Sequence, residues 1–165
     1  MTKLYCAYGS NLNQKQMTAR CPGAKLVGVG KIFGYELVFR GFSDSAYATI
    51  VAKEGSFVPA ALYELSEEEK DEKSLDAYEG FPYQYGKRDI TVEIGDQTVS
   101  AMIYVMNSNK RAGLPSQRYF ARIWDGYNDL GLDKTILKKA LQNTFEQFYY
   151  MEALENPRES WTFFQ

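Results

Sequence analysis

The sequence contains no histidine, so any acid–base chemistry in this chain falls to carboxylates, tyrosines, lysines or cysteines. Ser-His, Cys-His and His-metal sites are excluded, because each needs an imidazole as base or ligand. Cys6 and Cys21 show neither CxxC nor Cys/His metal spacing, and we expect both to be buried thiols. Any catalytic base must therefore be one of these four kinds of group.

Glu79 is a candidate for that base. It closes the segment LDAYEG, at the point where a helical pattern stops before Gly80. Negative charge at a helix C-terminus is unfavourable, and apolar rings desolvate a carboxylate, so both effects raise its pKa from about 4.3 toward neutrality. A solvated surface glutamate beside a helix-ending glycine is the alternative that the residues leave open. The rings expected to surround it are Tyr78, Phe81, Tyr83 and Tyr85.

A short turn near the N-terminus is a candidate site for a negatively charged ligand. It joins a strand-like segment to a helix-like one, so the first N–H groups of the helix lack internal partners. These groups and the helix dipole favour a carboxylate or phosphate, and a glycine permits close approach. A structural N-cap by one of the asparagines is the alternative. The turn consists of Tyr8, Gly9, Ser10, Asn11 and Leu12, with Asn13 directly after it.

The 13 tyrosines give the chain a large supply of hydroxyl groups. Tyr104 lies on a strand that carries large side chains on both faces and is expected to be buried, and Tyr119 lies in the segment PSQRY. A buried tyrosine hydroxyl usually finds a hydrogen-bond partner, so structural anchoring is the ordinary role. A hydroxyl that orients a ligand or a carboxylate is the alternative.

The hydrophobic patterns predict strands first and helices mainly at the end, which favours an α+β fold. Glycines within the second predicted strand segment suggest bulges. Strands are expected over residues 3–8, 26–52, 57–65, 83–94 and 98–106, the last two as a hairpin around Gly95 and Asp96. Helices are expected over residues 12–20, 66–78, 116–130 and 134–154.

Two helices carry further signals. Ser66 and Glu69 have the spacing of a capping box, and Asp133 is expected to cap the last helix. An apolar stripe on that helix is expected to pack on the core: Ile136, Leu137, Ala140, Leu141, Phe145 and Phe148. We expect the same of the terminal Trp161, Phe163 and Phe164.

Length, charge and hydrophobicity limit the number of domains, the partners and the location that we expect. A chain of 165 residues favours a single domain spanning residues 1–165. The net charge of −2 gives no electrostatic basis for binding nucleic acid. No apolar run approaches the roughly 20 residues needed to cross a bilayer, and no signal peptide is recognisable, so we expect a cytoplasmic protein without membrane contact. The oligomeric state stays open.

Four segments in this order, YGSNL, LDAYEG, SAMIYVM and PSQRYFARIWDGYNDLGL, resemble the gamma-glutamylcyclotransferase family, also called the AIG2-like group. The resemblance covers about residues 4–132. It implies a small mixed β-barrel flanked by helices, with the turn and Glu79 facing each other across one cavity. It also implies that Glu79 is catalytic, that residues 8–12 bind substrate, and that Tyr104 and Tyr119 lie near the substrate.

The reaction implied by the resemblance is attack of the free α-amine of a γ-glutamyl group on its own side-chain amide carbonyl. It releases 5-oxoproline and an amino acid or an amine, and it needs neither a metal nor a cofactor. Glu79 would move the protons, and the turn would hold the α-carboxylate or polarise the carbonyl. The alternative function is a module that binds an acidic metabolite without turnover. A purely structural protein, with Glu79 in solvent far from Ser10, is the third possibility.

Overall fold

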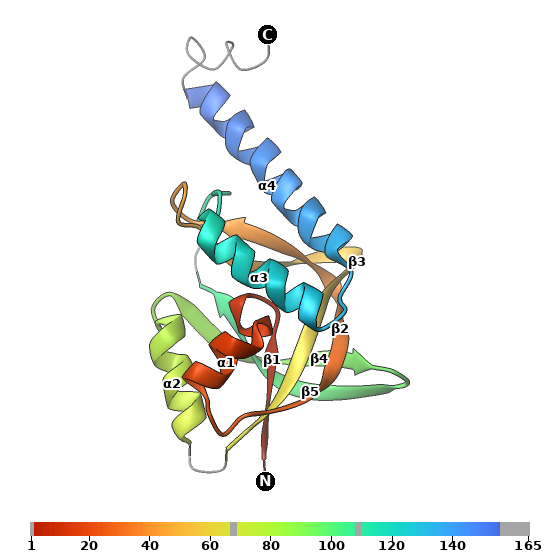
Figure 1. Cartoon of the computed structure of the whole chain (residues 1–165). Coiled ribbons are helices and arrows are strands. Elements are labelled where there is room, and N and C mark those ends of the chain that lie inside the picture. Colours follow the sequence, from red (N-terminus) through yellow and green to blue (C-terminus); the bar gives the residue numbers. More distant parts are fainter. Residues whose placement is uncertain (1, 67–68, 108–109, 156–165) are drawn as a thin grey trace.

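The computed structural model describes residues 2–66, 69–107 and 110–155 (Figure 1). Within them the strands close into a barrel in the order β1-β3-β2-β4-β5. The β1–β5 pairing is parallel and the other pairings are antiparallel, so the barrel is mixed, as the resemblance implied. The strands are β1 Lys3–Ala7, β2 Lys25–Arg40, β3 Tyr47–Leu65, β4 Tyr85–Ile94 and β5 Gln97–Met106.

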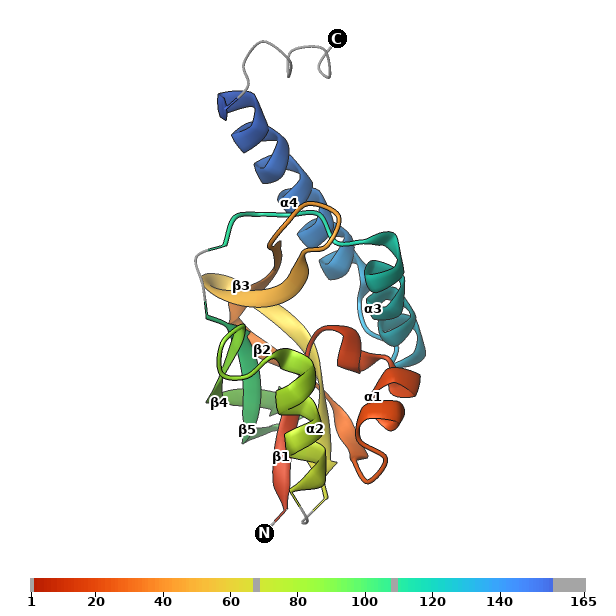
Figure 2. The same cartoon turned by 90° about the vertical axis from the view of Figure 1, so that its left-hand side faces the viewer.

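The helices surround this barrel and confirm the α+β class. They are α1 Gln14–Arg20, α2 Lys70–Glu79, α3 Gln117–Asp129 and α4 Lys134–Glu155, and a 3₁₀ turn, η1 Ser10–Leu12, precedes α1. Lys3 of β1 and Lys87 of β4 both bond Glu72, so α2 lies against the barrel wall (Figure 2). The C-terminal part of α4 extends away from the barrel (Figure 1).

The long strands β2 and β3 follow the predicted bends. Their pairing shifts register between Leu26 and Gly28 and again between Phe33 and Tyr35, which confirms bulges at these glycine-containing segments. The strand boundaries predicted over residues 26–52 and 57–65 are wrong. The first strand, β2, already ends at Arg40, and the second, β3, runs without interruption across residues 53–56. The hairpin of β4 and β5 is confirmed, with Ile94 opposite Gln97.

Helix starts were predicted with mixed success. Asn13 caps α1 by accepting from the N–H of Gln16 at 3.2 Å, and Ser116 and Asp133 cap α3 and α4 in the same way. The capping box of Ser66 and Glu69 is wrong. Glu69 takes a left-handed conformation before α2 with φ of 56°, and the N–H of Ser66 donates instead to Oδ2 of Asp71 at 2.8 Å.

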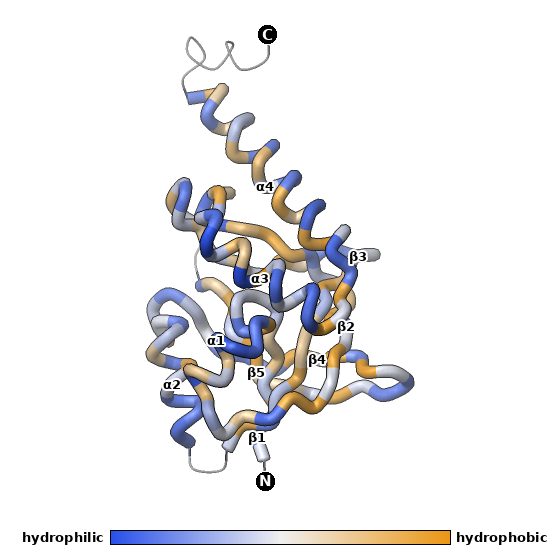
Figure 3. Tube along the Cα trace, viewed as in Figure 1, coloured by the Kyte–Doolittle hydropathy of each residue, from blue (hydrophilic) through white to orange (hydrophobic). Residues whose placement is uncertain are grey.

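The core fills the barrel and the space beneath α3 and the first half of α4. Figure 3 shows apolar residues along the strands and polar ones along much of α1 and α2. Cys6 and Cys21 are both buried free thiols, as expected. No helix in the described ranges is long and apolar enough to span a membrane.

The apolar stripe of α4 packs on the core only in part. Leu137 and Ala140 are buried, but Phe145 is 48% exposed because α4 continues beyond the end of the barrel. The expected core packing is therefore wrong for the second half of this helix. Trp161, Phe163 and Phe164 lie outside the described residues.

Gly126 of α3 lies directly on the η1 turn. A Cβ at this position would stand 2.7 Å from the carbonyl carbon of Leu12 and 2.8 Å from the backbone nitrogen of Asn13. Backbone atoms cannot turn aside as a flexible side chain can, so a larger residue must push α3 away from the turn. The glycine is what allows α3 and η1 to pack closely.

We therefore expect Gly126→Ala to lower the free energy of unfolding by about 1–3 kcal/mol, measured by urea denaturation. Gly28→Ala is the matched control, because its added methyl would meet only Cγ2 of Ile94 at 3.8 Å. The control should change stability by less than about 0.5 kcal/mol. Equal effects of the two substitutions would contradict the tight α3–η1 contact.

Candidate active site

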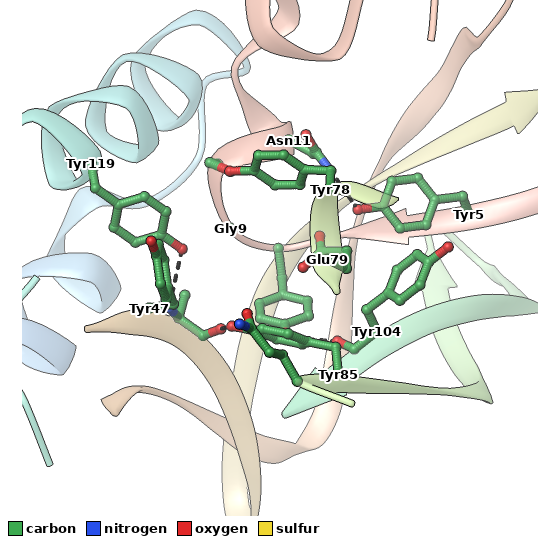
Figure 4. A pocket seen from close by; sticks show the side chains of 13 residues that line it. Tyr5, Gly9, Asn11, Tyr47, Tyr78, Glu79, Tyr85, Tyr104 and Tyr119 are labelled. Carbon is green, nitrogen blue, oxygen red and sulfur yellow. Dashed lines mark hydrogen bonds between the residues drawn. The ribbon is translucent and has the colours of Figure 1, made fainter. Parts of the chain in front are cut away.

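A cavity of about 110 Å³ opens between the ends of several barrel strands, η1 and the C-terminus of α2. Figure 4 shows its side chains, and tyrosine is the commonest residue type among them. Glu79 is the acidic residue among the described side chains that line it. The lining residues are Tyr5, Tyr8, Gly9, Ser10, Asn11, Tyr47, Ala48, Tyr78, Glu79, Gln84, Tyr85, Tyr104 and Tyr119.

The cavity brings together the residues that the sequence singled out, with one exception. Glu79, the turn from Tyr8 to Asn11, Tyr104 and Tyr119 all line it. Leu12 does not, because its side chain is 0% exposed in the core next to Gly126. The third possibility, with Glu79 in solvent far from Ser10, is therefore wrong.

Glu79 is the last residue of α2, and Gly80 ends the helix with φ of 65°. Its carboxyl group has no hydrogen bond or ion pair within the described part of the chain. Burial raises the pKa of Glu79 from 4.5 to about 7, and the Arg20 guanidinium opposes this rise. Tyr78 and Tyr85 line the cavity with it as expected, whereas Tyr83 is 89% exposed and contributes nothing.

The turn of α2 before Glu79 is tied to the barrel. Asp76 accepts the hydroxyl proton of Tyr104 at 2.5 Å and an ammonium proton of Lys87 at 2.9 Å. Lys87 also bonds Glu72 one turn earlier, at 2.9 Å. Tyr104 was expected to orient Glu79 or the substrate. Its hydroxyl is bonded to Asp76, so it contacts the helix turn that precedes Glu79.

The predicted turn lies against the opposite side of the cavity. The first internal hydrogen bond of η1 is donated by the N–H of Leu12 to the carbonyl of Gly9 at 3.0 Å, so the N–H groups of Ser10 and Asn11 stand ahead of it. The hydroxyl of Ser10 bonds that of Tyr78 at 3.1 Å, and this bond links the turn to the residue before Glu79. The cap of α1 is Asn13 and not Asn11.

A third side of the cavity is formed around Ala48 at the start of β3. The N–H of Ala48 donates to the Tyr119 hydroxyl oxygen at 3.1 Å, and its carbonyl accepts the Tyr85 hydroxyl proton at 2.7 Å. The ring of Tyr47 packs edge-on against that of Tyr119 with centroids 5.1 Å apart. The backbone of one residue, Ala48, therefore joins β3, β4 and α3 at the cavity.

Some lining residues escaped the sequence reasoning: Tyr5, Tyr47, Ala48 and Gln84. Tyr47 and Ala48 carry no local signal, since only strand pairing brings them to the cavity. Tyr5 did offer one, because it is a residue with a hydroxyl in a short buried strand, three positions before Tyr8.

The sequence and the structure are both similar to known proteins. The sequence matches the family described as gamma-glutamyl cyclotransferase, AIG2-like, over residues 5–124. A solved structure named gamma-glutamyl cyclotransferase has 25% identity and a TM-score of 0.75, covering 85% of this chain and 86% of that chain. An uncharacterized protein from Homo sapiens has 26% identity and a TM-score of 0.75, covering 84% and 86%. Among curated proteins, none matches the sequence significantly.

A yeast structure, named as a gamma glutamyl cyclotransferase specific to glutathione, shares the fold. It has 10% identity and a TM-score of 0.63, covering 88% of this chain and 96% of that chain. At this identity the likeness concerns the fold alone.

The unpaired carboxyl of Glu79 has a consequence for stability. A carboxyl whose pKa is higher in the folded than in the unfolded protein costs stability as the pH rises from about 4.5 to about 7. Glu79→Gln removes this cost, so it should stabilise the protein at pH 8 by on the order of 1–3 kcal/mol and change little at pH 4.5. Thermal and urea unfolding at the two pH values measure it.

Glu72→Gln on the same helix is the control of opposite sign. Lys3 and Lys87 hold the pKa of Glu72 below its ordinary value. Its carboxylate therefore stabilises the protein above pH 4.5, and its amide should destabilise the protein at pH 8. If Glu79→Gln also destabilised the protein at pH 8, the result would contradict the conclusion that the Glu79 carboxylate is desolvated and costs stability.

Proposed function

The chain belongs to the gamma-glutamyl cyclotransferase, AIG2-like family, and from that premise and the geometry of its cavity we propose that it is a cyclotransferase-type enzyme. It converts a γ-glutamyl group to 5-oxoproline and releases an amino acid or an amine. The observation that carries this proposal is the carboxyl of Glu79, desolvated and without a partner in the described chain, in the same cavity as the residues 8–11 turn.

The reaction joins two groups of one substrate molecule. The α-nitrogen attacks the side-chain amide carbon, a new C–N bond closes the five-membered lactam, and the original amide C–N bond breaks. The leaving nitrogen gains the two protons that the α-ammonium loses. Since nucleophile and electrophile already share a molecule, the enzyme has to hold the reactive conformer, move protons and stabilise the oxyanion.

Glu79 is the residue suited to move the protons. As a carboxylate it accepts a proton from the α-ammonium, and as an acid it delivers a proton to the leaving nitrogen, returning to the carboxylate. A group that must do both works best with a pKa near the working pH, and the raised pKa of about 7 meets this condition. The chemistry as drawn uses no metal or cofactor.

The turn and the tyrosines bind the γ-glutamyl moiety. The N–H groups of Ser10 and Asn11 can donate to the α-carboxylate or to the reacting carbonyl. The Tyr119 oxygen already accepts from Ala48, so its hydroxyl proton is available to a ligand. Tyr8 lines the cavity and donates to the carbonyl of Tyr104 at 2.7 Å, so its ring serves as a fixed wall.

A binding module for an acidic metabolite is the competing proposal. An anionic ligand next to the ionised Glu79 would have to overcome like-charge repulsion, or keep that carboxyl protonated. In a γ-glutamyl group the α-ammonium offsets the charge of the α-carboxylate and supplies a proton to Glu79. The two proposals differ in whether the ligand is converted.

A panel of γ-glutamyl amino acids and γ-glutamyl amines, assayed for 5-oxoproline release, tests the proposal. We expect turnover of at least one member, and a loss of roughly 10²- to 10⁴-fold in kcat for Glu79→Gln, which keeps the shape but not the base. Glu146→Gln, the same chemical change at an exposed position of α4, should stay within about threefold. Binding of panel members without any release would favour the binding module.

The pH dependence gives an independent check. The value of kcat/KM should rise with pH through an inflection near 7, because only the carboxylate of Glu79 can accept the first proton. Arg20→Gln should move this inflection upward, since the guanidinium favours the carboxylate. Lys15→Gln, an exposed change on the same α1 helix, should leave it in place. An inflection near 4.5 in the wild type would contradict the assignment of Glu79 as the base that accepts the first proton.

A further inference from the structure

The tyrosine hydroxyls of the cavity differ in whether their protons are free to reach a ligand. Tyr8 donates to the carbonyl of Tyr104, Tyr85 to the carbonyl of Ala48, and Tyr104 to Asp76. All three hydroxyl protons are therefore donated to protein acceptors and not to a ligand. A hydroxyl that accepts a hydrogen bond from a fixed N–H donor has its own proton left over.

Tyr5 is such a hydroxyl. Its oxygen accepts from Nδ2 of Asn11 at 2.9 Å, and an amide N–H₂ group can only donate. The hydroxyl proton of Tyr5 has no acceptor within the described residues, although the side chain is 3% exposed and lines the cavity. Its ring is fixed between Tyr63, with centroids 6.4 Å apart, and Tyr104, with centroids 5.9 Å apart.

A chain of hydrogen bonds runs from a positive charge to this hydroxyl. The Arg20 guanidinium donates to Oδ1 of Asn11, and the Nδ2 of the same amide donates to Tyr5. Each bond in such a chain polarises the next, so the cation makes the last hydroxyl a stronger donor. Tyr63 donates to the backbone carbonyl of Asn11 at 3.2 Å, so its bond lies outside this chain of side-chain groups.

The end of this chain lies beside Glu79. Figure 4 shows Tyr5 and Tyr104 on one side of Glu79 and Tyr119 and Tyr47 on the other side of the cavity. The charge of Glu79 acts on the Tyr5 hydroxyl, and together with burial it raises the pKa of that phenol well above 10. Tyr5 therefore keeps its proton at every working pH. Because its oxygen already accepts from Asn11, the hydroxyl is placed to donate that proton in a hydrogen bond to a ligand, which suits an oxyanion.

We propose that Tyr5 is a catalytic residue that donates a hydrogen bond to the carbonyl oxygen of the scissile γ-glutamyl amide as it becomes an oxyanion, with Asn11 and Arg20 as positioning residues behind it. This inference rests on the proposed function. Glu79 then serves the two nitrogens of the reaction and Tyr5 its oxygen. Tyr5 keeps its proton throughout, so no atom is transferred to or from it.

Tyr5→Phe tests this assignment, since it removes the donor and leaves the ring that packs on Tyr63 and Tyr104. With the best panel substrate at pH 8.5, kcat should fall about 10²-fold while KM changes less than about threefold, because the bond strengthens only in the transition state. Tyr63→Phe is the matched control. It removes one hydroxyl that bonds the same Asn11 but does not line the cavity, and kcat should stay within about threefold.

Arg20→Gln tests the chain behind Tyr5. At pH 8.5, where Glu79 is ionised, it should lower kcat roughly 10-fold when Tyr5 is present and less than about twofold in the Tyr5→Phe background. A purely structural role of Arg20 would lower kcat equally in both backgrounds. Arg20→Gln leaves the buried core untouched, so it can be measured even if Tyr5→Phe folds poorly. An unchanged kcat for Arg20→Gln alone would overturn the charged chain.

The outcomes separate this inference from the function on which it rests. If the wild type releases 5-oxoproline but Tyr5→Phe matches Tyr63→Phe, Tyr5 is not catalytic and the proposed function stands. A loss confined to KM would likewise overturn the oxyanion role, because it would show ground-state binding only. If the wild type releases no 5-oxoproline from any substrate, the proposed function and the role of Tyr5 are overturned together.

Discussion

The position of Glu79 depends on the contact between α2 and the barrel strands. Other carboxylates of α2 have partners: Asp71 accepts from Ser66, Glu72 from Lys3 and Lys87, and Asp76 from Lys87 and Tyr104. These bonds hold the rotation of the helix and the place of its last turn. Glu79 follows Asp76 by three residues, so it stands over the cavity and away from the lysines. The desolvation of one carboxyl is tolerated because its neighbours fix the helix.

Among the described residues that line the cavity there is no lysine or arginine, and most of the side chains are tyrosines. A lysine in contact with Glu79 would hold its pKa well below neutrality and make it a poor base. Phenol hydroxyls donate hydrogen bonds without adding charge. The Arg20 guanidinium bonds Ser10 and Asn11 and stacks over Tyr78, 3.3 Å from the ring centroid. Because it does not bond Glu79 directly, it opposes the rise in the pKa of Glu79 without cancelling it.

Sequence reasoning succeeded where a local signal decides the structure. The YGSN turn, the end of α2 at Gly80, the asparagine cap of α1, the Asp133 cap of α4 and the β4–β5 hairpin follow from neighbouring residues. It failed where distant contacts decide. Phe145 belongs to the apolar stripe of α4, but it is exposed because α4 continues beyond the barrel. The carboxylate that accepts from the N–H of Ser66 is Asp71 and not Glu69. Leu12 was predicted to line the cavity, but it is buried in the core next to Gly126.

Tyr5 shows why a residue list from sequence is incomplete in a barrel. Its neighbours Leu4, Cys6 and Ala7 suggest a core strand, and its ring does pack in the core. The same side chain reaches the cavity because β1 ends there, with its hydroxyl meeting Asn11 six residues later. Whether such a hydroxyl anchors the fold or serves a ligand depends on the direction of one hydrogen bond. Because the Asn11 amide donates to it, the hydroxyl proton of Tyr5 remains available, whereas those of Tyr8, Tyr85 and Tyr104 do not.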